Sequence, residues 1–132
     1  MTDKKIKEII FDWQGVLMKT TGLNNRLVDW IKKRDEYDYS ILTNCPGDFS
    51  KKLKELDLEN VFKAVVNPEN SFLRKPQKEA YTKILREIGS KPEEVVFIDD
   101  SPTNVQAGNR LGIESILYKD NKTLFKELKN IL

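Results

Sequence analysis

Short apolar runs alternate with segments of helical periodicity along almost the whole chain, and this alternation limits the possible folds more than any other feature. Strands are predicted over residues 6–11, 39–43, 61–66, 95–98 and 113–118. Apolar residues recur at helical spacing over residues 23–31, 49–56, 80–88, 102–111 and 124–131. Strands that alternate with helices build parallel sheets covered on both faces. The sequence therefore predicts an α/β fold, a three-layer α/β/α sandwich around a five-stranded parallel sheet.

The length of 132 residues fits one compact domain, and we expect residues 1–132 to form it. Lys and Arg total 23 against 21 Asp and Glu, and the net charge of +2 is too small to indicate nucleic acid or an anionic membrane as a partner. The chain lacks an apolar run of about eighteen residues and a secretory leader pattern. With Cys45 as its single cysteine, no internal disulfide can form, so we expect a cytoplasmic protein.

The chain contains no histidine. This excludes triads that use an imidazole base, histidine metal ligands and the usual proton shuttle near neutral pH. Catalysis would have to depend on carboxylates, Lys, Thr, Ser, Tyr or the one Cys.

Polar residues follow three of the predicted strands at their carboxyl ends. Asp12 follows the first strand, Thr43 and Asn44 follow the second, and Asp99 and Asp100 follow the fourth. Each one alone is typical of a turn or a helix cap. In a doubly wound parallel sheet, however, ligand sites lie at the carboxyl ends of the strands, near the point where strand order reverses. Together these residues indicate a functional site.

Four segments resemble, in order, the four motifs of the haloacid dehalogenase superfamily. They are residues 9–17 with Asp12 after an apolar strand, residues 41–44, residues 74–76 with Lys75, and residues 97–104 with the Asp99–Asp100 pair. The resemblance covers about residues 6 to 118 and implies that superfamily's Rossmann-like core. Response-regulator receivers have similar parts in another order, so the sequence does not favour that alternative.

The resemblance implies a role for each matching residue in phosphoryl transfer. Asp12 would be the nucleophile that forms an aspartyl-phosphate. The Thr43 hydroxyl and the backbone around Asn44 would hold the phosphoryl oxygens, and Lys75 would neutralise them while restraining Asp12.

The resemblance also implies a bound Mg²⁺. Asp12, Asp100 and the backbone carbonyl of Gln14 would be its ligands, and Asp99 and Asn104 would orient them. A carboxylate can approach a phosphate dianion only if cations screen their repulsion, and Mg²⁺ with an ammonium supplies that screening. We expect both cations to keep the pKa of Asp12 low.

Gln14 departs from the phosphatase pattern, which usually has Asp at this position as the general acid and base. An amide cannot exchange a proton with a leaving group or a water near neutral pH. Three interpretations stay open: a Mg²⁺-dependent phosphatase for phosphate monoesters with reduced activity, a phosphate- or protein-binding pseudoenzyme, or the chemistry of another branch such as dehalogenases. Members of those other branches use a helical cap.

The sequence leaves no room for such a cap. About twenty residues separate Leu17 from the second strand and about thirty separate Asn44 from Lys75, and elements of the core need most of them. We therefore expect an open pocket that takes a phosphorylated substrate, small or large, or that an oligomer partner covers.

Four other features near the motifs have two interpretations each. Trp13 either stacks on a substrate or packs in the core, and packing is favoured. Cys45 is oxidation-sensitive or inert, with the second favoured. The lysines at 51, 52 and 54 attract an anionic substrate or form a solvated helix face, which is favoured. Ser101 is predicted to cap a helix rather than to act as a nucleophile.

Overall fold

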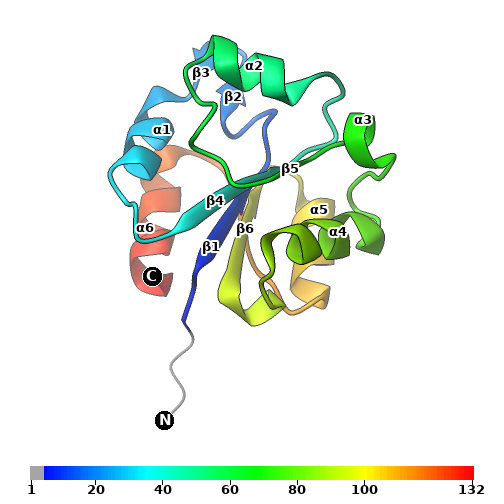
Figure 1. The fold of residues 1–132 in the computed structure, drawn as a ribbon. Coiled ribbons are helices and arrows are strands. Elements are labelled where there is room, and N and C mark those ends of the chain that lie inside the picture. The colour runs from blue at the N-terminus through cyan, green and yellow to red at the C-terminus, as the bar shows by residue number, and fades with distance from the viewer. Residues whose placement is uncertain (1–4) are drawn as a thin grey trace.

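The computed structural model describes residues 5–132 and contains a five-stranded parallel sheet in the order β5-β4-β1-β6-β7 (Figure 1). The strands are β1 Glu8–Phe11, β4 Asp38–Leu42, β5 Val65–Val66, β6 Val95–Asp99 and β7 Glu114–Leu117. β1 lies at the centre and pairs with both β4 and β6. The predicted number of strands and their parallel arrangement are confirmed.

Helices cover both faces of this sheet and complete the predicted three layers (Figure 1). One core cluster joins Ile9 and Phe11 of β1 to α1 Asn25–Lys32, α2 Phe49–Glu55 and α6 Asn121–Ile131. A second cluster joins Ile10, on the other face, to α4 Lys78–Ile88 and α5 Pro102–Arg110. The alternation of β1 side chains between the two clusters follows from the two-residue period of a strand. The remaining helices are α3 Pro68–Ser71 and the 3₁₀ helix η1 Pro92–Glu94.

Three predicted boundaries are wrong by two residues or more. The strand expected over residues 61–66 is reduced to β5, because Val61 N–H donates to Leu58 O (3.2 Å) in a turn after α2. The apolar run there reflects a half-buried loop, since Val61 and Phe62 pack against the core from outside the sheet. β1 begins at Glu8 rather than at Ile6. Leu23, expected on a helix, lies in a strand.

That strand belongs to a small antiparallel hairpin, β2 Met18–Lys19 and β3 Gly22–Leu23. Its first strand continues directly from the loop after β1, because Gly15 N–H donates to Met18 O (2.8 Å). Asn24 closes the hairpin: its side-chain amide donates to Val16 O (2.9 Å) and its side chain caps α1. The turn residues Thr20 and Thr21 are exposed.

Polar side chains and a glycine cap several helices. Asp48 caps α2 by accepting from Lys51 N (3.2 Å), and Ser101 caps α5 by accepting from Asn104 N (3.4 Å). Gly89 ends α4 in a left-handed conformation at φ 70°.

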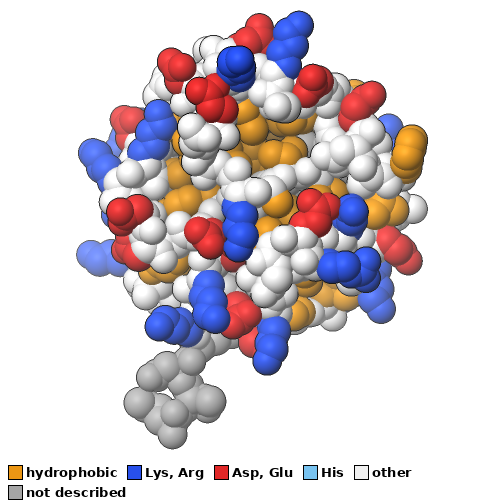
Figure 2. All heavy atoms as spheres, viewed as in Figure 1, with side chains coloured by type: hydrophobic (Ala, Val, Ile, Leu, Met, Phe, Trp, Pro, Cys, Tyr) orange, Lys and Arg blue, Asp and Glu red, His pale blue; other side chains and the backbone are white. Residues whose placement is uncertain are grey.

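None of the helices within residues 5–132 is long and apolar enough to cross a membrane. Acidic and basic side chains are interspersed over the face shown in Figure 2.

Candidate functional site

The candidate site lies at the carboxyl end of the sheet, where the strands on either side of β1 meet it. Asp12 follows β1 and its N–H donates to Ile98 O of β6 (2.9 Å), while Thr43 follows β4 and its N–H donates to Val66 O of β5 (3.0 Å). Asp99 is the last residue of β6. Strand order reverses at β1, so residues far apart in sequence meet at this point.

Lys75 joins two of these carboxylates. Its ammonium lies 2.9 Å from Asp12 Oδ1 and 2.6 Å from Asp99 Oδ2, and its side chain is 1% exposed. Asn44 positions the Lys75 backbone, because its Oδ1 accepts from Lys75 N (2.7 Å) and its Nδ2 donates to Lys75 O (2.9 Å). The Asn44 side chain therefore ties the loop after β4 to the loop that contains Lys75, a role that the motif did not reveal.

Asp99 accepts three hydrogen bonds through its two carboxylate oxygens. Its Oδ1 accepts from Ser101 N (2.9 Å), and its Oδ2 accepts from Lys75 and from Asn104 Nδ2 (3.1 Å). Tyr81 supports this arrangement, since its hydroxyl donates to Asn104 O (2.7 Å). Asp99 thus orients Lys75.

Asp100 contrasts with Asp99. It is exposed, and its carboxylate accepts no hydrogen bond from the part of the chain that the structure describes. Gly15, at φ 88°, makes room for it: a Cβ atom at Gly15 would lie 2.1 Å from Asp100 Oδ2. Carboxylate oxygens of Asp12, Asp99 and Asp100 lie within 4.8 Å of one another. Three carboxylates with one contacting ammonium leave an excess of negative charge, and an oxygen-rich set of this kind fits a divalent cation.

The pKa of Asp12 is raised to about 7. Burial is the largest cause; Lys75 lowers the pKa, and Asp99 and Asp100 raise it again. Lys75 alone therefore does not keep the pKa of Asp12 low. The low pKa expected from the sequence was for Lys75 acting together with a bound Mg²⁺.

The loop after β4 offers hydrogen-bond donors beside Asp12. The Thr43 hydroxyl oxygen accepts from Cys45 N (3.0 Å), so its own proton stays available for a ligand oxygen.

Trp13 N–H donates to Asp12 Oδ1 (2.8 Å), which already accepts from Lys75. Asp12 is therefore fixed through one carboxylate oxygen.

All eight residues predicted for the site line one cavity of about 330 Å³. They are Asp12, Gln14, Thr43, Asn44, Lys75, Asp99, Asp100 and Asn104. Cys45 and Ser101 also line it. Gln14 is exposed, and its side chain makes no hydrogen bond within residues 5–132.

A sequence model of haloacid dehalogenase-like hydrolases matches residues 4–118. The chain belongs to this family. Among its relatives is a phosphorylated carbohydrates phosphatase of Thermotoga maritima, 36% identical over 102 residues, which are 76% of this chain and 46% of the relative. The chain spans less than half the length of the curated relatives that it matches.

Solved structures of haloacid dehalogenase-like proteins share the fold. A hydrolase of the superfamily from Ehrlichia chaffeensis aligns with a TM-score of 0.83 at 16% identity, covering 98% of this chain and 99% of that one. An enzyme of the family from Bacteroides thetaiotaomicron, solved in complex with magnesium and inorganic phosphate, aligns with a TM-score of 0.76 at 18% identity, covering 91% of this chain and 99% of that one. No separate cap domain is present within residues 5–132 of this haloacid dehalogenase-like chain.

Two of the side chains with open interpretations have structural roles. Trp13 is 1% exposed and packs edge-on against Phe49 at 5.4 Å between ring centroids, so the core interpretation is confirmed. Ser101 caps α5, as expected.

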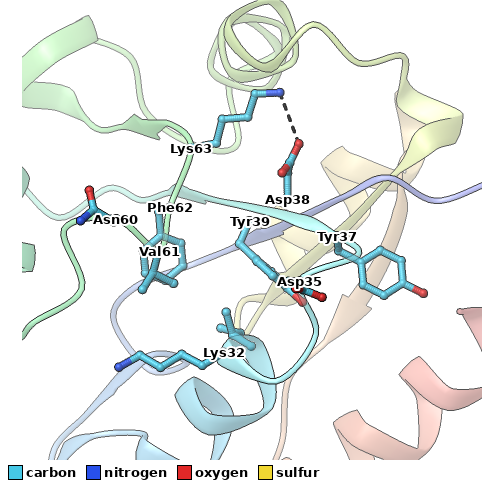
Figure 3. Close-up of a pocket in the computed structure, with 10 residues that line it drawn as sticks. Lys32, Asp35, Tyr37, Asp38, Tyr39, Asn60, Val61, Phe62 and Lys63 are labelled. Atoms are coloured by element: carbon cyan, nitrogen blue, oxygen red, sulfur yellow. Dashed lines mark ion pairs between the residues drawn. The ribbon is translucent and has the colours of Figure 1, made fainter.

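A second cavity, of about 400 Å³, lies at the amino end of β4 (Figure 3). Tyr39 and Val61 line it, and Figure 3 shows Lys63 extending toward Asp38, with which it forms an ion pair of 3.5 Å. Thr43 lies after the opposite end of β4, so this cavity is separate from the candidate site of the haloacid dehalogenase-like fold.

Proposed function

We propose that this protein is a Mg²⁺-dependent phosphatase that hydrolyses phosphate monoesters through an aspartyl-phosphate on Asp12. The observation that carries the proposal is the buried Lys75 ammonium 2.9 Å from Asp12, in one cavity with Thr43 and Asp100. The names of relatives support it, since they include a phosphorylated carbohydrates phosphatase and a phosphoglycolate phosphatase.

The reaction needs two displacements. In the first, a carboxylate oxygen of Asp12 attacks phosphorus and the bond from phosphorus to the leaving oxygen breaks. The Thr43 hydroxyl and the Lys75 ammonium stabilise the phosphoryl oxygens as charge develops on them. In the second, water attacks the phosphorus of the aspartyl-phosphate, releasing phosphate and regenerating Asp12.

A Mg²⁺ ion would be held by Asp12, Asp100 and the backbone carbonyl of Gln14. When bound, it supplies positive charge against the phosphoryl oxygens. Asp99 is not assigned as a ligand because its oxygens already accept from Lys75, Ser101 and Asn104.

Gln14 sets the limit on turnover. It occupies the place of a general acid, but its amide cannot transfer a proton near neutral pH. The leaving group must therefore take its proton from water, or be the anion of an alcohol or acid with a low pKa. Substrates with aryl or acyl leaving groups should therefore react best. The cavity has no cap over it within the described chain, which suits a large phosphorylated substrate or a partner subunit acting as a lid.

Gln14 also favours a second candidate, a pseudoenzyme that binds phosphate or a protein without turnover. A p-nitrophenyl phosphate assay with and without Mg²⁺ separates the two. We expect magnesium-dependent turnover that the Asp12→Asn variant loses; if the wild-type rate equals that of the variant, the pseudoenzyme is the correct description. Trapping with beryllium fluoride then shows whether Asp12 still accepts a phosphoryl mimic.

A further inference from the structure

Lys52 differs from the other lysines of α2 in where its ammonium lies. Nζ of Lys52 is 3.8 Å from Sγ of Cys45 and 4.5 Å from the centroid of the Phe49 ring. Lys51 and Lys54 are exposed, whereas Lys52 is half-buried. Because Cys45 lines the candidate site, the Lys52 ammonium lies one side chain away from that cavity.

Within residues 5–132, Lys52 has no carboxylate within ion-pair distance, while Lys75 has two. A sulfur atom and an aromatic ring attract an ammonium only weakly compared with a carboxylate. A partly desolvated, unpaired ammonium beside a cavity attracts anions more strongly than a lysine in open water.

The distance from the phosphoryl-binding residues is short enough for one substrate to reach both. The Thr43 hydroxyl accepts from Cys45 N (3.0 Å), and the Cys45 side chain leads to Lys52. Summed along this path, Thr43 Oγ1 and Lys52 Nζ are no more than about 12 Å apart. A phosphoryl group bound at Thr43 could therefore carry a leaving group that extends to Lys52.

We propose that Lys52 is a specificity-determining residue that selects phosphate monoesters whose leaving group carries a second anionic group, a carboxylate or a further phosphate. This inference rests on the proposed phosphatase function and names its substrate class. Lys52 contacts the remote anion and takes no part in bond breaking.

The test compares two aryl phosphates of nearly equal shape, 3-carboxyphenyl phosphate and 3-carbamoylphenyl phosphate, in the presence of Mg²⁺. The wild type should have a higher kcat/KM for the carboxylate than for the amide. In the Lys52→Met variant the ratio of the two kcat/KM values should fall about tenfold, mainly because KM for the carboxylate rises. A tenfold change corresponds to about 1.4 kcal/mol. Methionine keeps an apolar stem beside Phe49. Lys54→Met makes the same charge change on an exposed position of α2 and should keep the preference.

Two results would overturn the inference: a preference equal in Lys52→Met and the wild type, or an equal loss in Lys54→Met. A third substrate, 1,3-phenylene bisphosphate, shows whether a carboxylate or a second phosphate is the better anion. If neither aryl phosphate is turned over, the proposed phosphatase function fails. The ratio of their Kd values, measured by isothermal titration calorimetry in wild type and Lys52→Met, then decides on Lys52 alone.

Discussion

Lys75 and Asp99 form a buried ion pair of 2.6 Å, and the same ammonium holds Asp12 at 2.9 Å. The side chains of Lys75 and Asp99 are 1% and 0% exposed, so removing Lys75 leaves the buried Asp99 carboxylate without a cation beside it. Lys75 therefore stabilises the fold at the carboxyl ends of the central strands and is also a candidate catalytic residue.

We predict that Lys75→Met lowers the free energy of unfolding at pH 8 by about 3 to 5 kcal/mol, because Asp99 is left as an unpaired buried charge. The measurement is urea unfolding followed by circular dichroism. Adding Asp99→Asn to this variant should recover part of the loss, while Lys78→Met, an exposed change at the start of α4, should cost little. A single Lys75→Met variant as stable as the wild type would contradict the prediction.

Glu8 should make the fold less stable as pH rises. It is 1% exposed and accepts from the Ser40 hydroxyl (2.9 Å), and burial raises its pKa from 4.5 to about 7. Between these two pH values the folded state retains a proton that the unfolded state has lost. Glu8 thus contributes stability below pH 4.5 that disappears by about pH 7, at about 1.4 kcal/mol per pH unit at most.

Glu8→Gln should therefore unfold at a higher temperature than the wild type at pH 8 but at nearly the same temperature at pH 4. Differential scanning calorimetry across this range measures the difference. Glu59→Gln, an exposed change of the same kind, provides the control. An equal shift of Tm at both pH values would show that the charge of Glu8 is not the cause.

Gly15→Ala should weaken Mg²⁺ binding by at least about tenfold, since the new Cβ would lie 2.1 Å from Asp100 Oδ2 and would displace that carboxylate. Gly47→Ala is the matched control: Gly47 also has a positive φ, 108°, but a Cβ there meets no atom within 4 Å. Both variants should lose stability from backbone strain, of about 1 to 3 kcal/mol. Mg²⁺ affinity by calorimetry distinguishes them, and an equal loss in both would reject the role of the Gly15–Asp100 contact.

Gln14→Asp should raise kcat for alkyl phosphates by about 10-fold or more and should raise it less for aryl phosphates, because only the alkyl leaving groups need a proton. Gln14→Asn keeps an amide and serves as the control. Steady-state kinetics on one alkyl and one aryl substrate suffice, and equal increases would show that proton transfer was not the limiting deficit.

The sequence predicts the site better than it predicts the connections around it. Asp12, Thr43 and Asp99 could be placed because each ends an apolar strand, and the geometry of a parallel sheet then brings them together. The short β5 and the β2–β3 hairpin could not be predicted. Val61 and Phe62 are apolar because they pack against the core from a loop, and Leu23 packs against the core from the hairpin strand β3, so apolar character alone does not distinguish a loop, a strand and a helix here.

Contacts between loops were likewise hidden in the sequence. The reciprocal hydrogen bonds of Asn44 with Lys75 join positions 31 residues apart, and the contact of Lys52 with Cys45 depends on how α2 packs against the loop after β4. The close approach of Asp100 to Gly15 also depends on tertiary structure. The start of α3, in contrast, has a signal in the sequence, because Asn67 followed by Pro68 is a typical N-cap and first residue of a helix.

The exposed turn at Thr20 and Thr21 gives this architecture room to change. The hairpin is hydrogen-bonded to the Gly15 loop at its base, while its turn lies in solvent, where added residues are well tolerated. A helical segment inserted at this turn would form a cap next to Gln14, which bridges to Met18 of the hairpin, without altering any strand of the sheet. Descendants of such a chain could acquire new substrate preferences by lengthening one turn, with the chemistry beneath it left intact.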